Sequence, residues 1–132
     1  MSIYRHLGAW KHGDVTVVRF GEHRILDELA VKQIGDELNE IADQVDCRNL
    51  LLNFASVAGL SSAMLGKLLM LQQKMASKGG RLTLCEIEPE VQEVFTTTKL
   101  NHILDIRESE DDAIKAFASD THPGSATIGG SA

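Results

Sequence analysis

Apolar residues follow two different periods along this chain, and segments of the two kinds alternate. The run "VTVVRF" (Val15–Phe20) is rich in β-branched residues, "NLLLNFA" (Asn49–Ala55) is a continuous apolar run, and "RLTLCEI" (Arg81–Ile87) has a similar character. Such runs are typical of strands, and an apolar run without alternation is typical of a strand covered on both faces. We therefore expect three strands here, with Asn49–Ala55 buried.

Two weaker patterns add candidate strands at the ends of this set. The segment "YRHLGAW" (Tyr4–Trp10) precedes the glycine-containing turn "KHGD" and is predicted to pair with Val15–Phe20 as an antiparallel hairpin. The segment "HILDIRE" (His102–Glu108) predicts a last short strand. The intervening "GEHRIL" (Gly21–Leu26) is expected to be a loop.

Helix signals stand between the strands. Asp27, Ser61 and Ser109 are suitable N-caps, the last with Asp112 in a capping-box pattern, and Pro89 suits a first helical turn. Gly79-Gly80 is predicted to end the second helix, Ser61–Lys78, through a left-handed residue. The predicted apolar faces consist of Ile34, Leu38, Ile41 and Val45 in the first helix, Leu65, Leu68, Leu69 and Met75 in the second, Val91, Val94 and Phe95 in the third, and Ile114 and Phe117 in the fourth.

Alternating strands and helices with short connections imply βαβ crossovers and a largely parallel sheet. We expect one α/β domain over residues 1–119, with a central mixed, mostly parallel sheet of four or five strands and about four helices. Residues 120–132, "DTHPGSATIGGSA", are small and polar and are expected to be disordered. The predicted core contains Leu51, Phe54, Leu65, Leu68, Leu84, Val94 and Ile114.

Composition and charge narrow the function classes. The chain has 132 residues and a formal net charge of −6, which argues against nucleic acid and against an anionic membrane surface as partners. No apolar run approaches the ~18 residues of a membrane span, and the first residues lack the apolar core of a signal peptide. Cys47 and Cys85 form neither a disulfide framework nor a metal-binding pattern, and Cys85 is expected to be a buried, inert thiol. These features favour a reduced, cytoplasmic protein.

The usual enzyme signatures are missing from the sequence. It contains no G-x-S-x-G elbow, no P-loop and no G-x-G-x-x-G. The five histidines have no metal-ligand spacing; they are His6, His12, His23, His102 and His122. We therefore predict no catalytic residue, no metal and no cofactor.

The pair Ser61-Ser62 opens the second predicted helix, just past the end of a buried strand. Serine is among the best N-cap residues, so composition alone favours a purely structural role for the pair.

A longer pattern gives the pair a second interpretation. The stretch from Val15 to Ala118 resembles the STAS domain of anti-sigma-factor antagonists, above all in "LLLNFASVAGLSSAMLGKLLMLQQKMASKGGRLTLCEIEPEVQEVFTTTKL" and the following "ILDI". In that family an Asp-Ser-Ser-Gly-like motif starts a helix after a buried strand, and a Gly-Gly and a P-x-V segment follow. Here the motif position is Leu60 to Ala63, so Leu60 replaces the acidic residue and Ala63 the glycine, while Gly79-Gly80 and Pro89-Glu90-Val91 match.

The resemblance implies a partner-switching regulator of transcription. Family members bind an anti-sigma factor that is a serine kinase, the kinase phosphorylates the motif serine, and a phosphatase reverses the reaction. Unphosphorylated, the antagonist holds the anti-sigma factor and frees a sigma factor. The resemblance makes Ser62 the expected phosphoacceptor, with Ser61 as the alternative. Leu60 bears on kinase recognition.

Loops that follow parallel strands gather at one end of a sheet, so we expect the partner to bind at the serine end of the domain. The exposed edge there is predicted to include the loop Gly21–Leu26, with Arg24 near its tip, and the first turns of the second helix, with Ser61, Met64 and Lys67. Two alternatives remain open: a STAS docking or scaffold module without phosphorylation, and a nucleotide- or anion-binding module or enzyme. No phosphate-cradling glycine loop supports the second of these.

Overall fold

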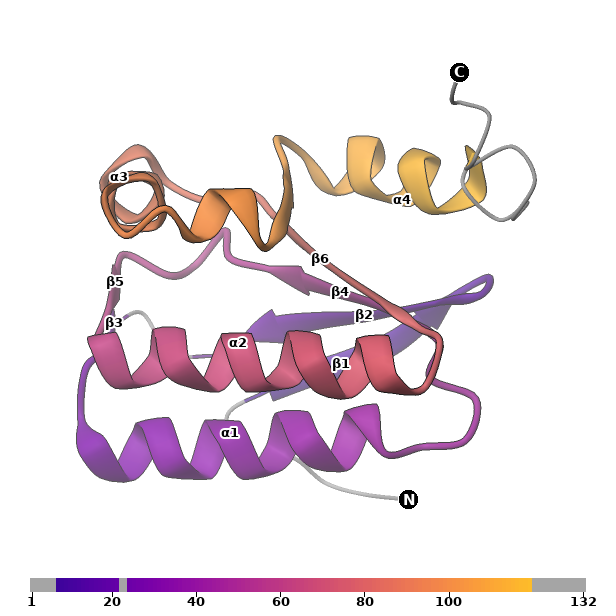
Figure 1. Ribbon diagram of the computed structural model, residues 1–132, viewed down its shortest axis with the longest axis horizontal. Coiled ribbons are helices and arrows are strands. Elements are labelled where there is room, and N and C mark those ends of the chain that lie inside the picture. The colour runs from indigo at the N-terminus through magenta and orange to yellow at the C-terminus, as the bar shows by residue number, and fades with distance from the viewer. Residues whose placement is uncertain (1–6, 22–23, 120–132) are drawn as a thin grey trace.

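The computed structural model describes residues 7–21 and 24–119, through which a five-stranded sheet runs with helices on both sides (Figure 1). The elements in chain order are β1 Leu7–His12, β2 Val15–Phe20, β3 Arg24–Ile25, α1 Glu28–Ala42, β4 Asn49–Asn53, β5 Gly59–Leu60, α2 Ser62–Ser77, β6 Arg81–Cys85, α3 Pro89–Thr97, the 3-10 helix η1 Leu100–His102, β7 Asp105–Arg107 and α4 Glu110–Ser119.

The sheet has the strand order β1-β2-β4-β6-β7. β1 is antiparallel to β2, and the other neighbours are parallel, so the predicted mixed, mostly parallel α/β sheet with four helices is confirmed. The continuous apolar run forms β4 at the centre, where β2 and β6 hydrogen-bond to its two edges. β3 and β5 form a separate two-stranded ladder.

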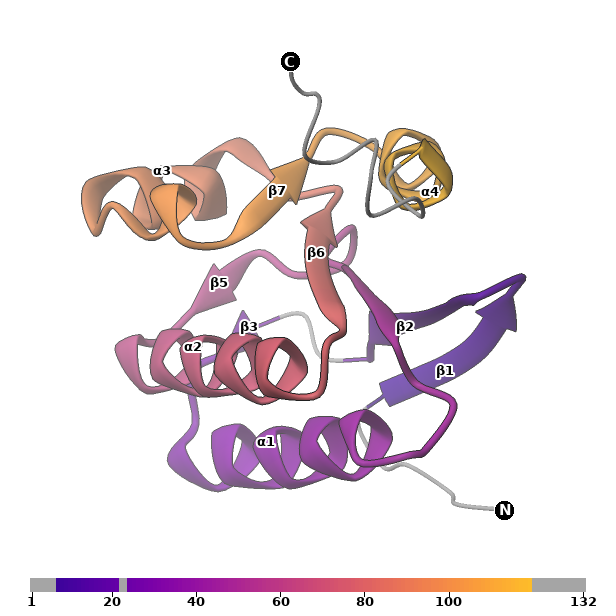
Figure 2. The ribbon, with the colours of Figure 1, turned by 45° about the vertical axis from the view of Figure 1, so that its right-hand side comes forward.

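Each face of the sheet has its own core. α1 and α2 lie on one side and α4 on the other, as Figure 2 shows. On the first side Leu50, Leu52 and Leu68 are fully buried, and on the second Leu51 and Phe117 are buried. Of the predicted core, Leu51, Phe54, Leu65, Leu68 and Leu84 are buried, whereas Val94 and Ile114 are partly buried and pack against the two clusters.

The two glycines after α2 end the helix in the predicted way. Gly79 has a φ of 77°, a left-handed value that costs glycine little. The Gly80 amide donates to the Met75 carbonyl over 2.7 Å and the Gly79 amide to the Ala76 carbonyl over 3.1 Å, which is a Schellman motif. A Cβ on Gly80 would lie 2.5 Å from the Arg48 carbonyl oxygen, so only glycine fits there.

The remaining helix starts also follow the sequence. The Ala30 amide donates to Asp27 Oδ2 over 3.0 Å, and the Asp112 amide donates to Ser109 Oγ over 3.1 Å. Pro89 is the first residue of α3, where its missing N–H leaves no hydrogen bond unmade.

The expected place of Val45 on the buried face of the first helix is wrong. α1 ends at Ala42, and Val45 is 92% exposed. The ammonium group of Lys78 donates to the carbonyls of Ala42 and Gln44, which turns the chain away from the helix axis before Val45. Cys47 is the next residue that is buried in this core.

Several element boundaries also differ from the expected ones, and β4 and β6 each end two residues earlier than expected, at Asn53 and Cys85. The hairpin arm is Leu7–His12, so it lies further along the chain than Tyr4–Trp10, and the loop Gly21–Leu26 contains β3. The last strand is only Asp105–Arg107, because Leu100–His102 forms a 3-10 turn. Tyr4 to His6, Glu22 and His23, and the predicted tail 120–132 lie outside the described residues.

Replacing Leu68 by alanine is expected to lower the free energy of unfolding by about 2–5 kcal/mol, because the truncation leaves a cavity in the core. Met70→Ala on the same helix is the matched control: Met70 is 61% exposed, so its change should stay within about 0.5 kcal/mol. Urea unfolding of the two variants measures the difference. Equal losses in both would contradict the burial of Leu68.

Candidate functional site

A short parallel ladder holds the junction at which α2 begins. Arg24 lies opposite Gly59 and Ile25 opposite Leu60 in the pairing of β3 with β5. The Ser61 amide donates to the Ile25 carbonyl over 3.0 Å, which continues the ladder up to the first residues of α2. The start of α2 is therefore attached to the segment that leads into α1.

Phe54 anchors the loop between β4 and this ladder. Its ring is fully buried, and its centroid lies 4.7 Å from that of Phe20 and 6.4 Å from that of Phe95. The Ser56 hydroxyl adds a hydrogen bond of 2.7 Å to the Phe20 carbonyl. The loop is thus fixed by core packing, and the residues after it have a defined position.

A polar group also ties this loop to α4. The buried Asn53 side chain accepts from the Ala55 amide at 2.8 Å and donates to Glu110 Oε1 at 2.6 Å. The Glu110 amide donates to Glu86 Oε2 at 2.8 Å. Asn53 therefore links the start of the loop to the first residue of α4, on the far side of the sheet.

The two serines occupy different positions although they are adjacent. Ser61 is the N-cap of α2: its backbone is extended, with φ −89° and ψ 163°, and its Oγ accepts from the Met64 amide at 3.3 Å. Ser62 is the first helical residue and is exposed. Within the part of the chain that the structure describes, the Ser62 hydroxyl has no hydrogen-bond partner. The capping interpretation is confirmed for Ser61, and the Ser62 hydroxyl is accessible to another molecule.

The expected exposure of Met64 is wrong. Met64 is fully buried and belongs to the main core, because its helical position turns it toward the sheet. Lys67 is half-buried, and its Cδ lies 3.0 Å from the position that a Cβ on Gly35 would take. The Lys67 stem thus lies against α1, further along α2 than the serines.

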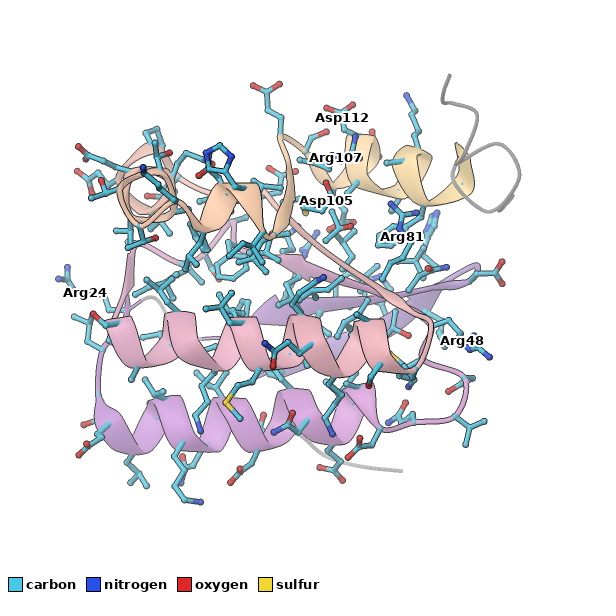
Figure 3. All side chains as sticks on the ribbon, viewed as in Figure 1. Arg24, Arg48, Arg81, Asp105, Arg107 and Asp112 are labelled. Atoms are coloured by element: carbon cyan, nitrogen blue, oxygen red, sulfur yellow. The ribbon has the colours of Figure 1, made fainter. Side chains whose placement is uncertain are left out.

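Arg24 lies where it was expected, at the edge of the domain beside the start of α2, and its side chain points away from the sheet (Figure 3). Its Cγ and Nε and the Cδ2 of Leu26 all lie 3.9 Å from the position that a Cβ on Gly59 would take. Arg24, Leu26, Gly59, Ser61 and Ser62 therefore form one surface, which we call the α2 edge.

Leu26 belongs to the loop that was expected at this edge, whereas Leu29 was missed by sequence reasoning. Leu26, just before α1, is 47% exposed, and Leu29, in the first turn of α1, is 61% exposed. No periodic pattern in the sequence marks this region, because each strand of the β3–β5 ladder has only two residues. Gly59 is the only residue of the ladder that stands out in the sequence. The α2 edge thus combines one exposed leucine, Leu26, with the Arg24 cation and the exposed Ser62 hydroxyl, and the exposed Leu29 follows at the start of α1.

Reactive chemistry elsewhere in the described chain is limited. Burial is the main cause that raises the pKa of the Cys85 thiol to about 12, followed by the charges of Glu110 and Glu86, so this thiol stays protonated at neutral pH. Burial also raises the pKa of Cys47. Residues 7–21 and 24–119 contain no cluster of three or more potential metal ligands from histidine, cysteine, aspartate and glutamate, and no helix able to cross a bilayer.

Comparison with known proteins identifies this arrangement. The model of the STAS domain family matches residues 9–113, which is most of the chain and includes the whole α2 edge. The chain belongs to the STAS domain family.

Individual relatives of this STAS domain agree with the match. A candidate anti-sigma factor antagonist, BtrV of Bordetella bronchiseptica, is 34% identical over 80 residues, which cover 59% of this chain and 69% of BtrV. A STAS domain protein of Planctomyces limnophilus superposes with a TM-score of 0.74 at 21% identity, over 83% of this chain and 95% of that one.

The phosphorylated form of SpoIIAA, a Bacillus cell fate determinant, superposes with a TM-score of 0.63 at 22% identity, over 83% of this chain and 97% of that one. At such identities the solved structures support the fold of this STAS domain and nothing finer. The family assignment rests on the match over residues 9–113.

Separate alanine variants should distinguish the two serines in this STAS domain. Ser61→Ala is expected to cost about 0.5–2 kcal/mol of unfolding free energy, because the Met64 amide loses its capping partner. Ser62→Ala is expected to stay within about 0.5 kcal/mol, because its hydroxyl is exposed and bonds to no residue that the structure describes. Urea melts of the two variants provide the measurement. A larger loss in Ser62→Ala would mean that Ser62 is the cap.

Proposed function

We propose that this protein is an anti-sigma factor antagonist that binds a serine-kinase anti-sigma factor through the α2 edge and is switched off by phosphorylation of Ser62. The observation that carries the proposal is the exposed Ser62 hydroxyl, which bonds to none of the described residues and stands at the first position of a helix that Ser61 already caps. The name of BtrV supports the class of partner, and the phosphorylated form of SpoIIAA supports the modification.

The modification is a phosphoryl transfer from ATP. The Ser62 Oγ attacks the γ-phosphorus, the bond from that phosphorus to the bridging oxygen breaks, and ADP leaves. The hydroxyl proton passes to a base of the kinase. A phosphatase restores the hydroxyl with water and releases inorganic phosphate, so the cycle needs a second partner enzyme. We place both partners with this protein in the cytoplasm.

The start of α2 can accept a phosphate without unfolding. A helix N-terminus carries free amides and the positive end of the helix dipole, and both favour an anion. The first turn of α2 contains no acidic side chain that would repel the phosphate. Because Ser61 makes the capping hydrogen bond, a change at Ser62 leaves that bond in place.

The bound partner would not tolerate the same charge. Phosphate adds about −1.5 to −2 charges at neutral pH. A partner surface packed on the α2 edge would have to cover this charge beside Gly59 and Leu26, and burying an unpaired charge is costly. Phosphorylation is therefore expected to dissociate the complex while the fold persists.

Leu60, which stands where the family has an acidic residue, has a structural role in this chain. It is half-buried, pairs with Ile25 in the ladder and packs against the main core. An aspartate there would place a charge against apolar side chains. Kinase recognition in this chain therefore has to use other residues of the α2 edge, of which Ser61 and Arg24 are polar.

Incubation with the cognate kinase and ATP, followed by peptide mapping, is expected to find phosphate on Ser62. Ser62→Ala should abolish phosphorylation and bind the kinase constitutively, and Ser61→Ala should keep the phosphorylation site. Phosphate on Ser61 alone would move the acceptor by one residue. An active kinase that binds the protein and modifies neither serine would exclude the switch and leave a docking module.

The charge itself can be tested without the kinase reaction. Ser62→Asp is expected to remain folded, since a carboxylate suits a helix N-terminus, and to weaken kinase binding about tenfold or more. Titration calorimetry against the kinase measures the affinity, and Ser77→Asp, exposed at the other end of α2, is the matched control. Equal affinities for the two variants would contradict the placement of the partner on the α2 edge.

A further inference from the structure

The outer edge of β1 is open for another strand. β1 is the first strand in the sheet order, and no other described strand pairs with its second side. It pairs with β2 in a regular register over all six residues, without a proline, and Gly8 to His12 are exposed. A regular exposed edge strand is a template for pairing with another chain.

Nothing in the described part of a single copy requires a glycine at position 8. Its φ is not positive, and a Cβ added to it would meet nothing within 4 Å. Glycine inside a strand weakens the strand and often marks a place where another backbone or side chain comes close. The glycine at this position therefore points to a neighbour outside the described chain.

Trp10 is the complementary feature on the same strand. Gly8 lies opposite Arg19 and Trp10 opposite Val17, so both stand on the face of the sheet that α4 covers further along. The Trp10 ring is 40% exposed, and the Arg19 guanidinium carbon lies 5.2 Å from its centroid. The large Trp10 ring thus lies two residues from Gly8, where the missing side chain leaves open space on the same face.

We infer that two copies of this protein pair through β1, antiparallel about a two-fold axis at Ala9, with Trp10 of each copy lying over Gly8 of the other. In such a pair, opposite residues must share a face, so the sum of their numbers is even. Pairing Ala9 with Ala9 matches Gly8 with Trp10 twice and Leu7 with Lys11 twice. A two-fold axis at Trp10 would place the two Trp10 rings opposite each other, and an axis at Gly8 would place the two glycines opposite each other.

The charge distribution also favours contact between two copies at β1. The chain carries −6, and the first turns of α1, α3 and α4 are acidic, whereas the hairpin from Leu7 to Phe20 holds two cations and one anion. The cations are paired within their own copy, Lys11 with Asp46 at 3.4 Å and Arg19 with Glu110 at 3.6 Å. Two copies therefore repel each other less at β1 than at these helix starts.

The small area that β1 can bury limits the affinity of the dimer. A standard stable interface buries about 800 Å² on each partner, and a six-residue edge offers less, so the dimer is expected to be weak and concentration-dependent. In Figure 2 β1 lies at the right of the domain, whereas β5 and the start of α2 lie at the left. A dimer of this kind therefore leaves both α2 edges open, and the inference does not depend on the proposed function.

A cysteine at the axis tests the register. Directly opposed residues of antiparallel strands have Cα atoms about 4.5–5.5 Å apart, within the range of a disulfide. Ala9→Cys is expected to form a covalent dimer on mild oxidation, much faster than Ala76→Cys, a control at an exposed position of α2. Cys47 and Cys85 are buried and should not compete. Equal rates for the two variants would overturn the inference.

Sedimentation of the unmodified chain tests the dimer itself. Raising the concentration from about 10 μM to about 1 mM should move the measured mass from 14.4 kDa toward twice that value. The fluorescence emission of Trp10, the only tryptophan, should shift to shorter wavelength because the ring becomes covered. Gly8→Glu should stay monomeric with a melting temperature no lower than that of the parent, because a Cβ at this position meets no described atom within 4 Å and glycine weakens a strand. A monomer throughout, or a Gly8→Glu variant that dimerises like the parent, would overturn the inference and leave this edge for a different chain.

Discussion

Strand β4 has to be covered on both of its faces, because Leu50 and Leu52 point to one side, Leu51 points to the other, and all three are fully buried. α1 and α2 cover the first side, and α4 covers the second. β2 and β6 hydrogen-bond to the two edges of β4. Connections between strands and helices are then forced to the ends of the sheet. The loop that leaves the carboxyl end of β4 is one of these connections, and it carries the chain to the serine pair.

The α2 edge takes its position from residues other than those that would contact a partner. Phe54 and Met64 lie inside the core on either side of it, and the Ile25 carbonyl holds the Ser61 amide. Ser62 and Arg24 are exposed. The residues that hold this edge in place are therefore mostly different from its exposed residues, so the exposed positions can change while the fold is kept.

The sequence predicted most of this fold because its strong signals are local. Continuous apolar runs specified β4 and β6, and capping residues specified the helix starts at Asp27, Ser61 and Ser109. The errors occurred where distant parts of the chain decide the structure. Val45 continues the helical period, yet the Lys78 side chain ends α1 before it.

The site was predicted less completely than the fold for the same reason. Ser61, Ser62 and Arg24 do lie together, but the ladder that joins them consists of two-residue strands from distant segments, and no periodic pattern announces it. Met64 was misplaced because the side of α2 that faces the sheet depends on how the helix packs.

Both ends of α2 are clamped. At its start the Ser61 amide is bound to β3, and at its end Gly80 fits so closely against the Arg48 carbonyl that no side chain can be added. Sliding or turning this helix of 16 residues, about 24 Å long, would disrupt both of these contacts. We therefore expect a charge placed on its first residue to change the surface around it and not the far side of the domain. The effect of such a charge would stay at the α2 edge, so only a molecule that contacts this surface would respond to it.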